Sequence, residues 1–337
     1  MNKERGYPMT INKALDKYMK EFVNLDPKDV KAARKSRDNL LLNISEFSDD
    51  GFFRLWSDIN RHFGSFARKT QCRELDDIDL MIGIKSEGAT YNVYAPWDHI
   101  TIFSNTNSLI QKSCTNEDGT LNSTLVLNQF KAKLRNVREY FSSEIHKNHE
   151  AVVLDLISKD WSFDIVPCFQ TVKESNGRSY LLIPNGKGKW KKTDPDMDKY
   201  KVTAMNGASE GRLLELIRLC KVWNKTKNVK TTQSYMLETM LVNYAEINDL
   251  NPGLKYRFRD ALRYISKNIY NSVEDLKDIQ GDLNNLTFEE RMKISNAAER
   301  DYKKIDEALI DELSIYTYKN AFQMWRAVLG DDFPKYE

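Results

Sequence analysis

The sequence contains few cysteines and prolines. Its 337 residues include only four cysteines and eight prolines. Cys72, Cys114, Cys168 and Cys220 are scattered along the chain and form no CxxC pair. This spacing excludes a zinc ribbon and a disulfide framework. We therefore expect free thiols, as in proteins of a reducing cytoplasm.

Long hydrophobic runs and an excess of one charge are also absent. Residues 1–20 are charged and contain no apolar run of signal-peptide length. No stretch approaches the roughly 20 apolar residues that span a bilayer. The 51 basic and 49 acidic residues give a net charge of +2, which excludes a strongly basic nucleic-acid coat. We expect a cytoplasmic protein with no membrane partner and no stable nucleic-acid partner, although a local basic groove stays open.

The composition is that of a globular protein, with 41% hydrophobic and 30% charged residues. At about 150 residues per domain, the length predicts about two domains. The first 200 residues mix helical and strand patterns, and residues 201–337 are nearly all helical. Helices are predicted over residues 14–22, 28–47, 124–141, 213–223, 235–244, 255–269 and 287–325. Strands are predicted over residues 77–84, 99–103, 151–157, 161–168 and 179–183.

Two connecting segments separate these elements. Residues 86–123 are rich in Ser, Thr, Asn and Gly, and we interpret them as a long insertion or loop with one short strand. Residues 194–201 contain a proline and many charges, which favours a linker between the two parts of the chain. The last predicted helix begins with Thr287 and Glu290, three residues apart, in a capping-box pattern.

Three acidic residues form the first candidate site. Asp77 and Asp79 are two residues apart in a predicted strand, so both side chains project from one face. Asp76 falls on the other, apolar face and is a poorer candidate. Asp164 stands alone in an apolar strand, where a charge is costly unless it is paired or holds a metal. Three carboxylates on neighbouring strands could hold two Mg²⁺ ions. Alternatively, these acids cap turns or pair with Lys and Arg.

Other candidate residues would bind phosphates or a base. Gly64-Ser65 precedes the strand of Asp77, and its backbone could approach a phosphate closely, although an ordinary turn is the alternative. Lys221 carries a charge suited to phosphate, but it lies on a helix in line with Arg218 and Lys225, as on a solvated face. Ser234-Tyr235 begins the next helix, where Ser could be an N-cap and Tyr a core residue.

Taken together, these residues resemble the polymerase-β-type nucleotidyltransferase superfamily. The resemblance rests on Gly64-Ser65, Asp77-Ile78-Asp79 and the single Asp164. Lys221 followed by Ser234-Tyr235 is similar to the arrangement in cyclic GMP-AMP synthase and the 2′-5′ oligoadenylate synthases. The long N-terminal helix and two further phrases resemble the bacterial CD-NTases, which make cyclic oligonucleotide signals in anti-phage defence (CBASS). These phrases are Phe163-Asp164-Ile165-Val166-Pro167-Cys168 and Ala321-Phe322-Gln323-Met324-Trp325 with Asp332-Phe333-Pro334.

The resemblance implies an α+β fold with a polymerase-β-like core, in which helices flank a mixed sheet. The core would comprise residues 1–200, including the long N-terminal helix. A helical domain of residues 201–337 would close over the nucleotide, and the active site would be the cleft between them.

The resemblance also implies a role for each candidate residue. Asp77 and Asp79 would bind both Mg²⁺ ions, for which Mn²⁺ could substitute, and Asp164 would complete the catalytic metal site. Gly64 and Ser65 would hold the triphosphate from one side. Lys221 and Ser234 would hold it from the other, and Tyr235 would stack on a base.

The implied activity is the joining of ribonucleoside triphosphates, ATP and/or GTP, into a cyclic di- or trinucleotide with release of pyrophosphate. The product would activate a separate effector protein, and regulatory proteins could be further partners. One alternative is a linear, template-free RNA nucleotidyltransferase of the CCA-adding, poly(A) or oligoadenylate type. Another is a catalytically silent nucleotide sensor.

Two further polar groups have a simpler interpretation. His146 and His149 are three residues apart, but a metal would need further ligands, so we interpret them as a polar segment before a strand. Four lysines surround Trp190 and could form a basic lip for phosphates or RNA, although a solvated loop is the simpler interpretation; they are Lys187, Lys189, Lys191 and Lys192. For Cys168 we expect a buried thiol. The zinc-binding insertion of animal cyclic GMP-AMP synthase has no counterpart here, so DNA activation of that kind is not expected.

Overall fold

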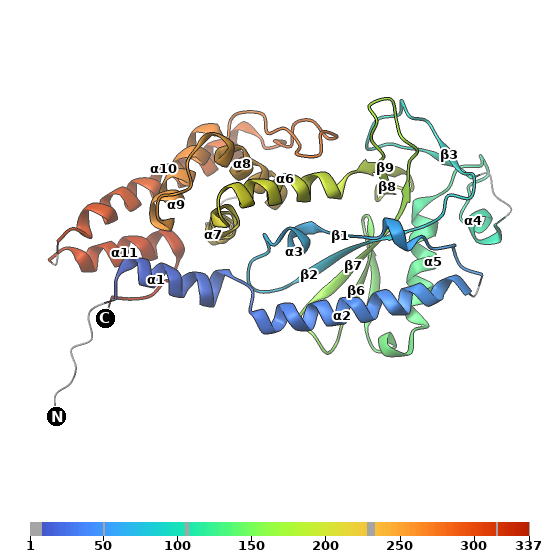
Figure 1. The fold of residues 1–337 in the computed structure, drawn as a ribbon, viewed down its shortest axis with the longest axis horizontal. Coiled ribbons are helices and arrows are strands. Elements are labelled where there is room, and N and C mark those ends of the chain that lie inside the picture. Colours follow the sequence, from blue (N-terminus) through green and yellow to red (C-terminus); the bar gives the residue numbers. More distant parts are fainter. Residues whose placement is uncertain (1–8, 50, 105–107, 228–232, 315, 337) are drawn as a thin grey trace. The chain divides into compact units, whose positions relative to one another are not determined.

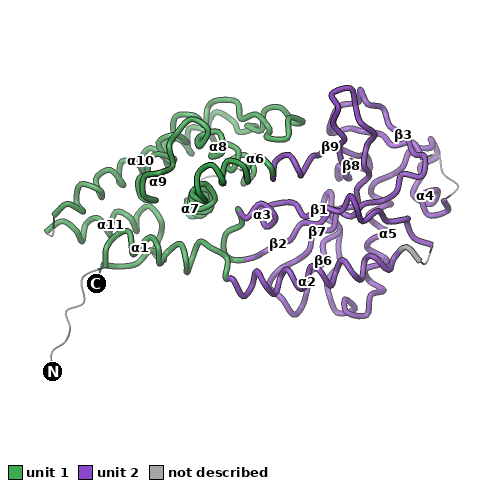
Figure 2. The backbone as a smooth tube through the Cα atoms, in the orientation of Figure 1, with its two compact units in different colours: residues 1–26, 70–74, 200–337 green, residues 27–69, 75–199 purple. Residues whose placement is uncertain are grey.

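The computed structural model describes residues 9–49, 51–104, 108–227, 233–314 and 316–336. They form two compact units, coloured green and purple in Figure 2. Unit 1 contains residues 1–26, 70–74 and 200–337, and unit 2 contains residues 27–69 and 75–199. Each unit is therefore assembled from segments that are far apart in the sequence. The domain limits at residues 200 and 201 stay a prediction.

Unit 2 is built on a mixed sheet, whose described strands follow the order β1-β2-β7-β6-β5, with β8 paired to β7 and β9 to β8 (Figure 1). The central pair, β2 and β7, is parallel, and its other neighbours are antiparallel. A separate small pair is formed by β3 and β4. The strands are β1 (Arg61–Phe63), β2 (Asp77–Gly83), β3 (Thr90–Tyr91), β4 (Ile102–Phe103), β5 (Glu144–Asn148), β6 (Ala151–Asp155), β7 (Ser162–Gln170), β8 (Leu181–Pro184) and β9 (Trp190–Thr193).

Helices flank this sheet. They are α2 (Pro27–Ser45), α3 (Gly64–Arg68), α4 (Leu109–Ser113) and α5 (Ser123–Arg135). Pro27 occupies the first helical position of α2, where its missing N–H costs nothing. The Asn122 side chain caps α5 by accepting the N–H groups of Thr124 and Leu125. Phe130 of α5 packs edge-on against Phe52, so α5 is anchored by a buried aromatic cluster.

Unit 1 is helical in the residues that the structure describes. Its helices are α1 (Ile11–Tyr18), α7 (Arg212–Thr226), α8 (Ser234–Ile247), α9 (Leu254–Asn268), α10 (Phe288–Asp311) and α11 (Tyr318–Leu329), together with most of α6 (Pro195–Ala208). Their apolar faces meet in one core that contains the fully buried rings of Trp223, Phe258, Trp325 and Phe333. The predicted capping box of Thr287 and Glu290 is confirmed at the start of α10.

Most predicted elements are present, but the prediction of one long C-terminal helix is wrong. The single helix expected over residues 287–325 is two packed helices, α10 and α11. Packing them side by side buries apolar surface that one long helix would leave exposed. The linker expected over residues 194–201 does contain the boundary between the two units, after Lys199, but it is helical and lies largely within α6. Pro195 and the acidic residues after it begin a helix, and Asp194 accepts the N–H of Met197.

The strand predictions missed the polar and short strands. Residues 144–148, interpreted as a polar segment, form β5 at one end of the sheet path. Residues 190–193, interpreted as part of a solvated loop, form β9. The strand expected over residues 99–103 shrinks to the two residues of β4. Edge strands carry polar side chains on their exposed face, which weakens the hydrophobic alternation on which prediction depends. None of the described helices is long and apolar enough to cross a membrane.

Candidate active site

The three acids predicted from the sequence lie on the central parallel strands of unit 2. The register of β2 and β7 places Asp79 opposite Asp164 and Asp77 opposite Ser162. Paired residues of neighbouring strands project from the same face, so the three side chains share one side of the sheet. One carboxylate oxygen of each acid lies within 4.8 Å of those of the other two. We call Asp77, Asp79 and Asp164 the acidic triad.

The acidic triad is electrostatically strained. Burial, then the charges of Asp77 and Asp164, raise the pKa of Asp79 well above its usual range. Burial, with a further contribution from Asp155, also raises the pKa of Asp164. Three close carboxylates repel one another, and a divalent cation would replace that repulsion with attraction. Because hard cations such as Mg²⁺ prefer carboxylate oxygens, these residues fit a metal site.

Gly64 lies directly against the triad. It begins α3 with a φ of +69°, in the left-handed region that favours glycine. A Cβ atom at this position would lie 1.7 Å from Oδ2 of Asp79. The residue is therefore glycine for two reasons, its backbone conformation and its contact with a carboxylate. Ser65, the next residue of α3, is half-buried.

Arg68 is a residue near the triad that sequence reasoning missed. It is the last residue of α3, and its side chain is buried and 3.1 Å from Asp198. Its positive charge lowers the pKa of Asp79, against the larger effects of burial and the neighbouring acids. Its position four residues after Gly64, on the same helix, is the signal in the sequence that could have identified it.

The polar face of the sheet extends beyond the triad. Val153 of β6 lies opposite Asp164, and His146 of β5 lies opposite Val153. His146 is thus on the same face, two strands from Asp164. Its Nδ1 is 3.3 Å from Asp155, and both side chains are half-exposed. The earlier interpretation of His146 as part of a polar segment missed this alignment, because it depends on long-range register.

Lys221 and Ser234 lie in unit 1. Lys221 of α7 is not on a solvated face: its Nζ lies 2.8 Å from Oε1 of Glu238 in α8, and both side chains are buried. The pair is mutually neutralising, since each charge has its counterion within hydrogen-bond distance. Ser234 is exposed and is the first residue of α8. The N-cap is Gln233, so the alternative role of Ser234 as an N-cap is wrong.

Tyr235 is held by a loop between α9 and α10. Its hydroxyl donates to Asp275 over 2.7 Å, and Nζ of Lys277 lies 4.0 Å from the centre of its ring. Asp275 also accepts backbone N–H groups from Lys277, Ile279 and Gln280. Burial by itself raises the pKa of Asp275, but Lys277, Tyr235 and these N–H groups bring that pKa below its usual value. The ring is therefore fixed in position, half-buried rather than in the core.

The cysteines and the lysine-rich segment have structural roles. All four thiols are free and buried, and burial raises the pKa of Cys168 to about 12. The expectation of a buried Cys168 is confirmed. Lys192 is buried against Glu174, and Lys191 pairs with Glu150, so neither is an ordinary solvated lysine. Trp190 is fully buried and its Nε1 donates to the backbone of Leu121.

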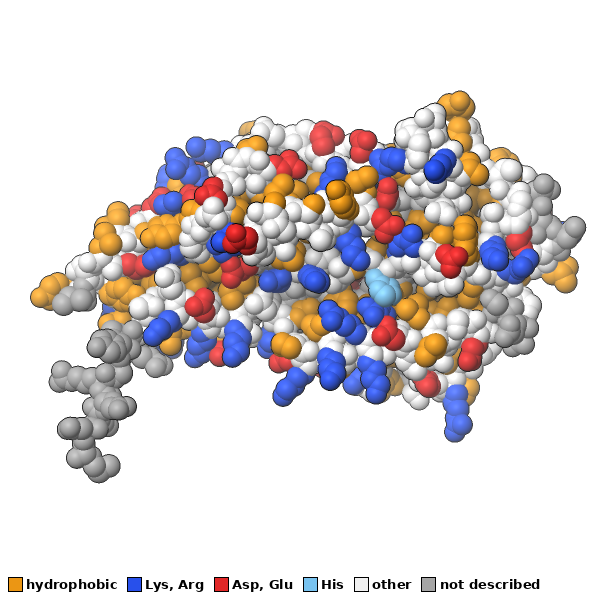
Figure 3. Space-filling model, viewed as in Figure 1, with side chains coloured by type: hydrophobic (Ala, Val, Ile, Leu, Met, Phe, Trp, Pro, Cys, Tyr) orange, Lys and Arg blue, Asp and Glu red, His pale blue; other side chains and the backbone are white. Residues whose placement is uncertain are grey.

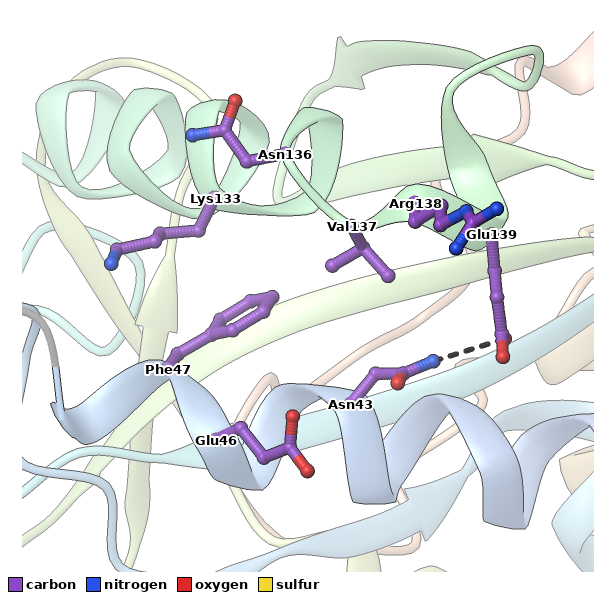
Figure 4. A pocket seen from close by; sticks show the side chains of 8 residues that line it. All are labelled: Asn43, Glu46, Phe47, Lys133, Asn136, Val137, Arg138 and Glu139. Atoms are coloured by element: carbon purple, nitrogen blue, oxygen red, sulfur yellow. Dashed lines mark hydrogen bonds between the residues drawn. The ribbon is translucent and has the colours of Figure 1, made fainter.

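A pocket of about 490 Å³ lies away from the triad, between α2 and the end of α5 (Figure 4). It is lined by Asn43, Glu46, Phe47, Lys133, Asn136, Val137, Arg138 and Glu139. The close-up shows Lys133 above the Phe47 ring, and the amide of Asn43 donates to Glu139 over 3.2 Å. The lining residues include none of the predicted site residues. We therefore do not place the catalytic chemistry there.

Comparisons with known proteins bear on the family. No protein-family model matches the chain. A curated protein of Bacillus cereus (strain VD146), named "Probable cyclic nucleotide synthase", is 40% identical to it over 331 residues. That match covers 97% of this chain and 99% of the relative.

Two solved structures share the fold. CdnC of E. coli MS115-1 with ATP has a TM-score of 0.67 and 17% identity, and the match covers 96% of this chain and 98% of CdnC. The cyclic AMP-GMP synthase DncV of Vibrio cholerae, described as a prokaryotic cGAS homolog, has a TM-score of 0.59 and 14% identity, and that match covers 82% of this chain and 69% of DncV. The predicted α+β fold is thereby confirmed.

Proposed function

We infer the reaction from one premise: this chain belongs to the bacterial CD-NTase family of cyclic nucleotide synthases, because it is 40% identical over nearly its whole length to a protein named "Probable cyclic nucleotide synthase". It is therefore a nucleotidyltransferase. We propose that it joins ribonucleoside triphosphates, ATP and/or GTP, into a cyclic di- or trinucleotide with release of pyrophosphate. The observation that carries this proposal is the acidic triad on adjacent strands, with Gly64 packed against it.

The triad would hold the divalent cations. Asp77 and Asp79 offer oxygen ligands from one strand, and Asp164 offers its own from the next. When bound, two Mg²⁺ ions would activate a ribose hydroxyl and neutralise the developing charge on the phosphates. The raised pKa values of Asp79 and Asp164 support this role, since burial and neighbouring acids disfavour their ionised forms in the absence of a cation.

Gly64 and Ser65 would position the triphosphate beside the triad. The absence of a side chain on Gly64 lets the chain approach the Asp79 carboxylate, and the same freedom lets it approach a phosphate. Ser65 adds a hydroxyl donor at the next position. Such fixed donors act by positioning and by stabilising charge, which is most of what phosphoryl transfer requires of a protein.

In unit 1, Lys221 and Ser234 would bind phosphate oxygens, and Tyr235 would stack on a base. The ammonium of Lys221 would exchange its ion pair with Glu238 for one with phosphate. The exposed hydroxyl of Ser234 is accessible to a ligand. Lys277 lies over the Tyr235 ring and Asp275 fixes its hydroxyl, so the ring is already oriented before a base stacks.

The bond changes follow from this arrangement. The ribose hydroxyl of one nucleotide attacks the α-phosphorus of another, a P–O bond forms, and the bond to pyrophosphate breaks. A second attack within the linear intermediate closes the ring and releases a second pyrophosphate from a dinucleotide. The hydroxyl protons pass to solvent or to a neighbouring proton-accepting group.

The product would act on a separate effector protein in anti-phage signalling. Regulatory partners are also proposed, since CdnC has been solved in a complex with HORMA-deltaN. The metal would be Mg²⁺, with Mn²⁺ able to replace it.

A single experiment tests the reaction. Purified protein is incubated with labelled ribonucleoside triphosphates and Mg²⁺ or Mn²⁺, then with phosphatase. We expect a phosphatase-resistant product, because a ring has no terminal phosphate. Asp77→Ala with Asp79→Ala should abolish it, whereas Asp76→Ala should not, since Asp76 is exposed and outside the triad.

The other outcomes would contradict the proposal. Phosphatase-sensitive oligomers, or labelling that requires added RNA, would indicate the linear nucleotidyltransferase. Nucleotide binding without a product under any condition would indicate the silent sensor. Omitting one nucleotide at a time would identify the bases of a cyclic product.

A further inference from the structure

Unit 2 contains a second pocket, which is lined in part by Phe66 and Ala67 of α3. None of the residues proposed above to bind the triphosphate lines it. Its volume is about 350 Å³, within the range of small-ligand pockets. We call it the basic pocket. It is lined by Arg34, Arg37, His62, Phe63, Phe66, Ala67, Lys69, Ile78, Asp79 and Lys199. Of the residues proposed for metal and triphosphate binding, only Asp79 lines it.

Three segments bring positive charge to this pocket. Arg34 and Arg37 come from α2, Lys69 follows the last residue of α3, and Lys199 comes from α6. In Figure 3, Lys and Arg side chains gather over the region of α2 and α3. Asp79 is the one carboxylate among the lining residues. Four full positive charges thus face one partly buried acid.

The surroundings of these cations leave a positive excess. Arg37 pairs with Asp38, its own neighbour in α2 and an exposed residue. Within the described part of the chain, Arg34 and Lys199 have no carboxylate at ion-pair distance. Burial is the main cause of a lowered pKa of His62, and Arg37 and Lys199 lower it further against the opposing effect of Asp38. Cations of both α2 and α6 therefore act on the imidazole, although Asp38 opposes them.

The remaining walls are apolar and aromatic. Phe63 and Phe66 are half-buried lining residues, and aromatic rings can stack with a flat ligand, although Phe63 also packs against the core cluster that contains Met81 and Val166. The guanidinium group of Arg34 can bind a phosphate through two parallel N–H groups, whereas Nε and Nη2 of Arg37 donate to the exposed Asp38, with which a phosphate would compete. Lys69 and Lys199 supply compact point charges. Cations next to aromatic walls are the chemistry that recognises a nucleoside phosphate.

We propose that the basic pocket binds a small phosphoanion, either a nucleotide or an oligophosphate, separately from the substrate triphosphate. The volume admits a small molecule, and the excess of cations selects an anion with at least two charges. The aromatic walls favour a nucleotide over an inorganic phosphate. This inference does not rest on the proposed reaction, because the pocket needs neither the metal nor the rest of the triad.

The test is calorimetric titration of the full chain in EDTA, which removes divalent metal from the triad. Inorganic pyrophosphate, AMP and adenosine are the three probes. We expect AMP to bind more tightly than pyrophosphate, and adenosine to bind more weakly than either. The double variant Arg34→Gln with Arg37→Gln should weaken AMP binding at least tenfold. Lys35→Gln is the matched control, since Lys35 is an exposed α2 cation that does not line the pocket.

Two further variants test whether AMP binds in this pocket rather than elsewhere on the protein. Ala67→Met would fill the pocket without removing a charge, and it should weaken AMP binding as well. Lys221→Met should leave AMP binding unchanged, because Lys221 lies in unit 1. Circular dichroism verifies that each variant is folded.

Several results would overturn the proposal. One is that none of the probes binds the wild-type protein. Another is equal affinity of the wild type and a folded Arg34→Gln/Arg37→Gln variant. Loss of binding in Lys221→Met would place the anion in the substrate site. Equal loss in Lys35→Gln, together with tight binding of duplex RNA or DNA, would instead indicate an extended nucleic-acid surface.

Discussion

The two units differ in the surroundings of their buried charged side chains. In unit 2, the carboxylates of the triad face one another, and the pKa values of Asp79 and Asp164 are raised. In unit 1, Lys221 is paired with Glu238, and the pKa of Asp275 is lowered by its cationic and hydrogen-bonding neighbours. In the first region, burial and neighbouring acids oppose ionisation of Asp79 and Arg68 offsets this only in part, whereas in the second region each of these charges has a partner at close range.

This difference predicts how each region responds to a ligand. A cation that binds the triad removes repulsion, so binding it stabilises unit 2. A phosphate that binds Lys221 must compete with Glu238. The free energy of phosphate binding is therefore reduced by the cost of breaking the Lys221–Glu238 ion pair. Metal binding to the triad should therefore change the free energy more than phosphate binding to Lys221 does. Substitutions in the two regions should accordingly differ in their effects on rate, KM and stability.

The largest effect is expected from removing one triad carboxylate. Asp164→Asn should lower the rate of pyrophosphate release by on the order of 10³-fold, because a neutral amide does not balance the charge of a metal ion. Asp160→Asn is the control, since Asp160 is exposed in the turn before β7. A rate within tenfold of wild type in Asp164→Asn would contradict the comparison, as it would show that the third acid is dispensable.

The ion pair of unit 1 can be separated into a structural and a binding role. Lys221→Met leaves Glu238 buried without a counterion, so it should lower the free energy of unfolding by about 3–5 kcal/mol. The double variant Lys221→Met with Glu238→Leu removes both charges and should restore most of that stability. If Lys221 binds phosphate, the KM for nucleotide stays raised by roughly tenfold or more in the double variant. Urea unfolding and steady-state kinetics measure the two effects. Recovery of both would show that Lys221 is structural alone.

Two substitutions of Tyr235 distinguish its ring from its hydroxyl. Tyr235→Phe keeps the ring beneath Lys277 but loses the bond to Asp275, which should cost about 1 kcal/mol of stability. Its KM for nucleotide should change less than threefold. Tyr235→Ala should raise that KM by about tenfold, because base stacking contributes roughly 1–3 kcal/mol. Equal KM values for the Phe and Ala variants would exclude stacking.

The smallest effect concerns the stability of the metal-free protein. Because the folded state raises the pKa of Asp79, the ionised side chain destabilises the fold as pH rises above the ordinary aspartate pKa. Asp79→Asn removes that charge, so its Tm at neutral pH should exceed that of wild type by a few degrees. The difference should vanish as pH falls towards about 4, where the unfolded carboxyl is protonated.

Mg²⁺ completes this measurement. It should raise the Tm of the wild type and have little effect on Asp79→Asn, since the variant has lost a ligand. Melting curves between pH 4 and pH 8 in EDTA, repeated with Mg²⁺, provide the comparison. A variant that melts below wild type at neutral pH would show that the triad is not strained.

Much of this site could be predicted because its signals are local. The alternation in β2 assigned Asp77 and Asp79 to one face, and the lone acid in an apolar strand pointed to Asp164. His146 and Arg68 could not be found in this way, because their relation to the triad depends on pairing between segments distant in sequence. The helix α6 was missed because Pro195 and its acidic neighbours are common to linkers and to helix starts.

The sequence alone determined which chemical groups are present and which local elements carry them. Periodicity assigned the acids to strands and the lysine and tyrosine to helices, because side-chain spacing is a property of neighbouring residues. The tertiary structure decided which charges meet. It placed Asp79 beside Asp164, packed Gly64 against a carboxylate, neutralised Lys221 with Glu238, and gathered cations from several elements in the basic pocket. These outcomes depend on register and burial across the whole chain, which no local pattern encodes.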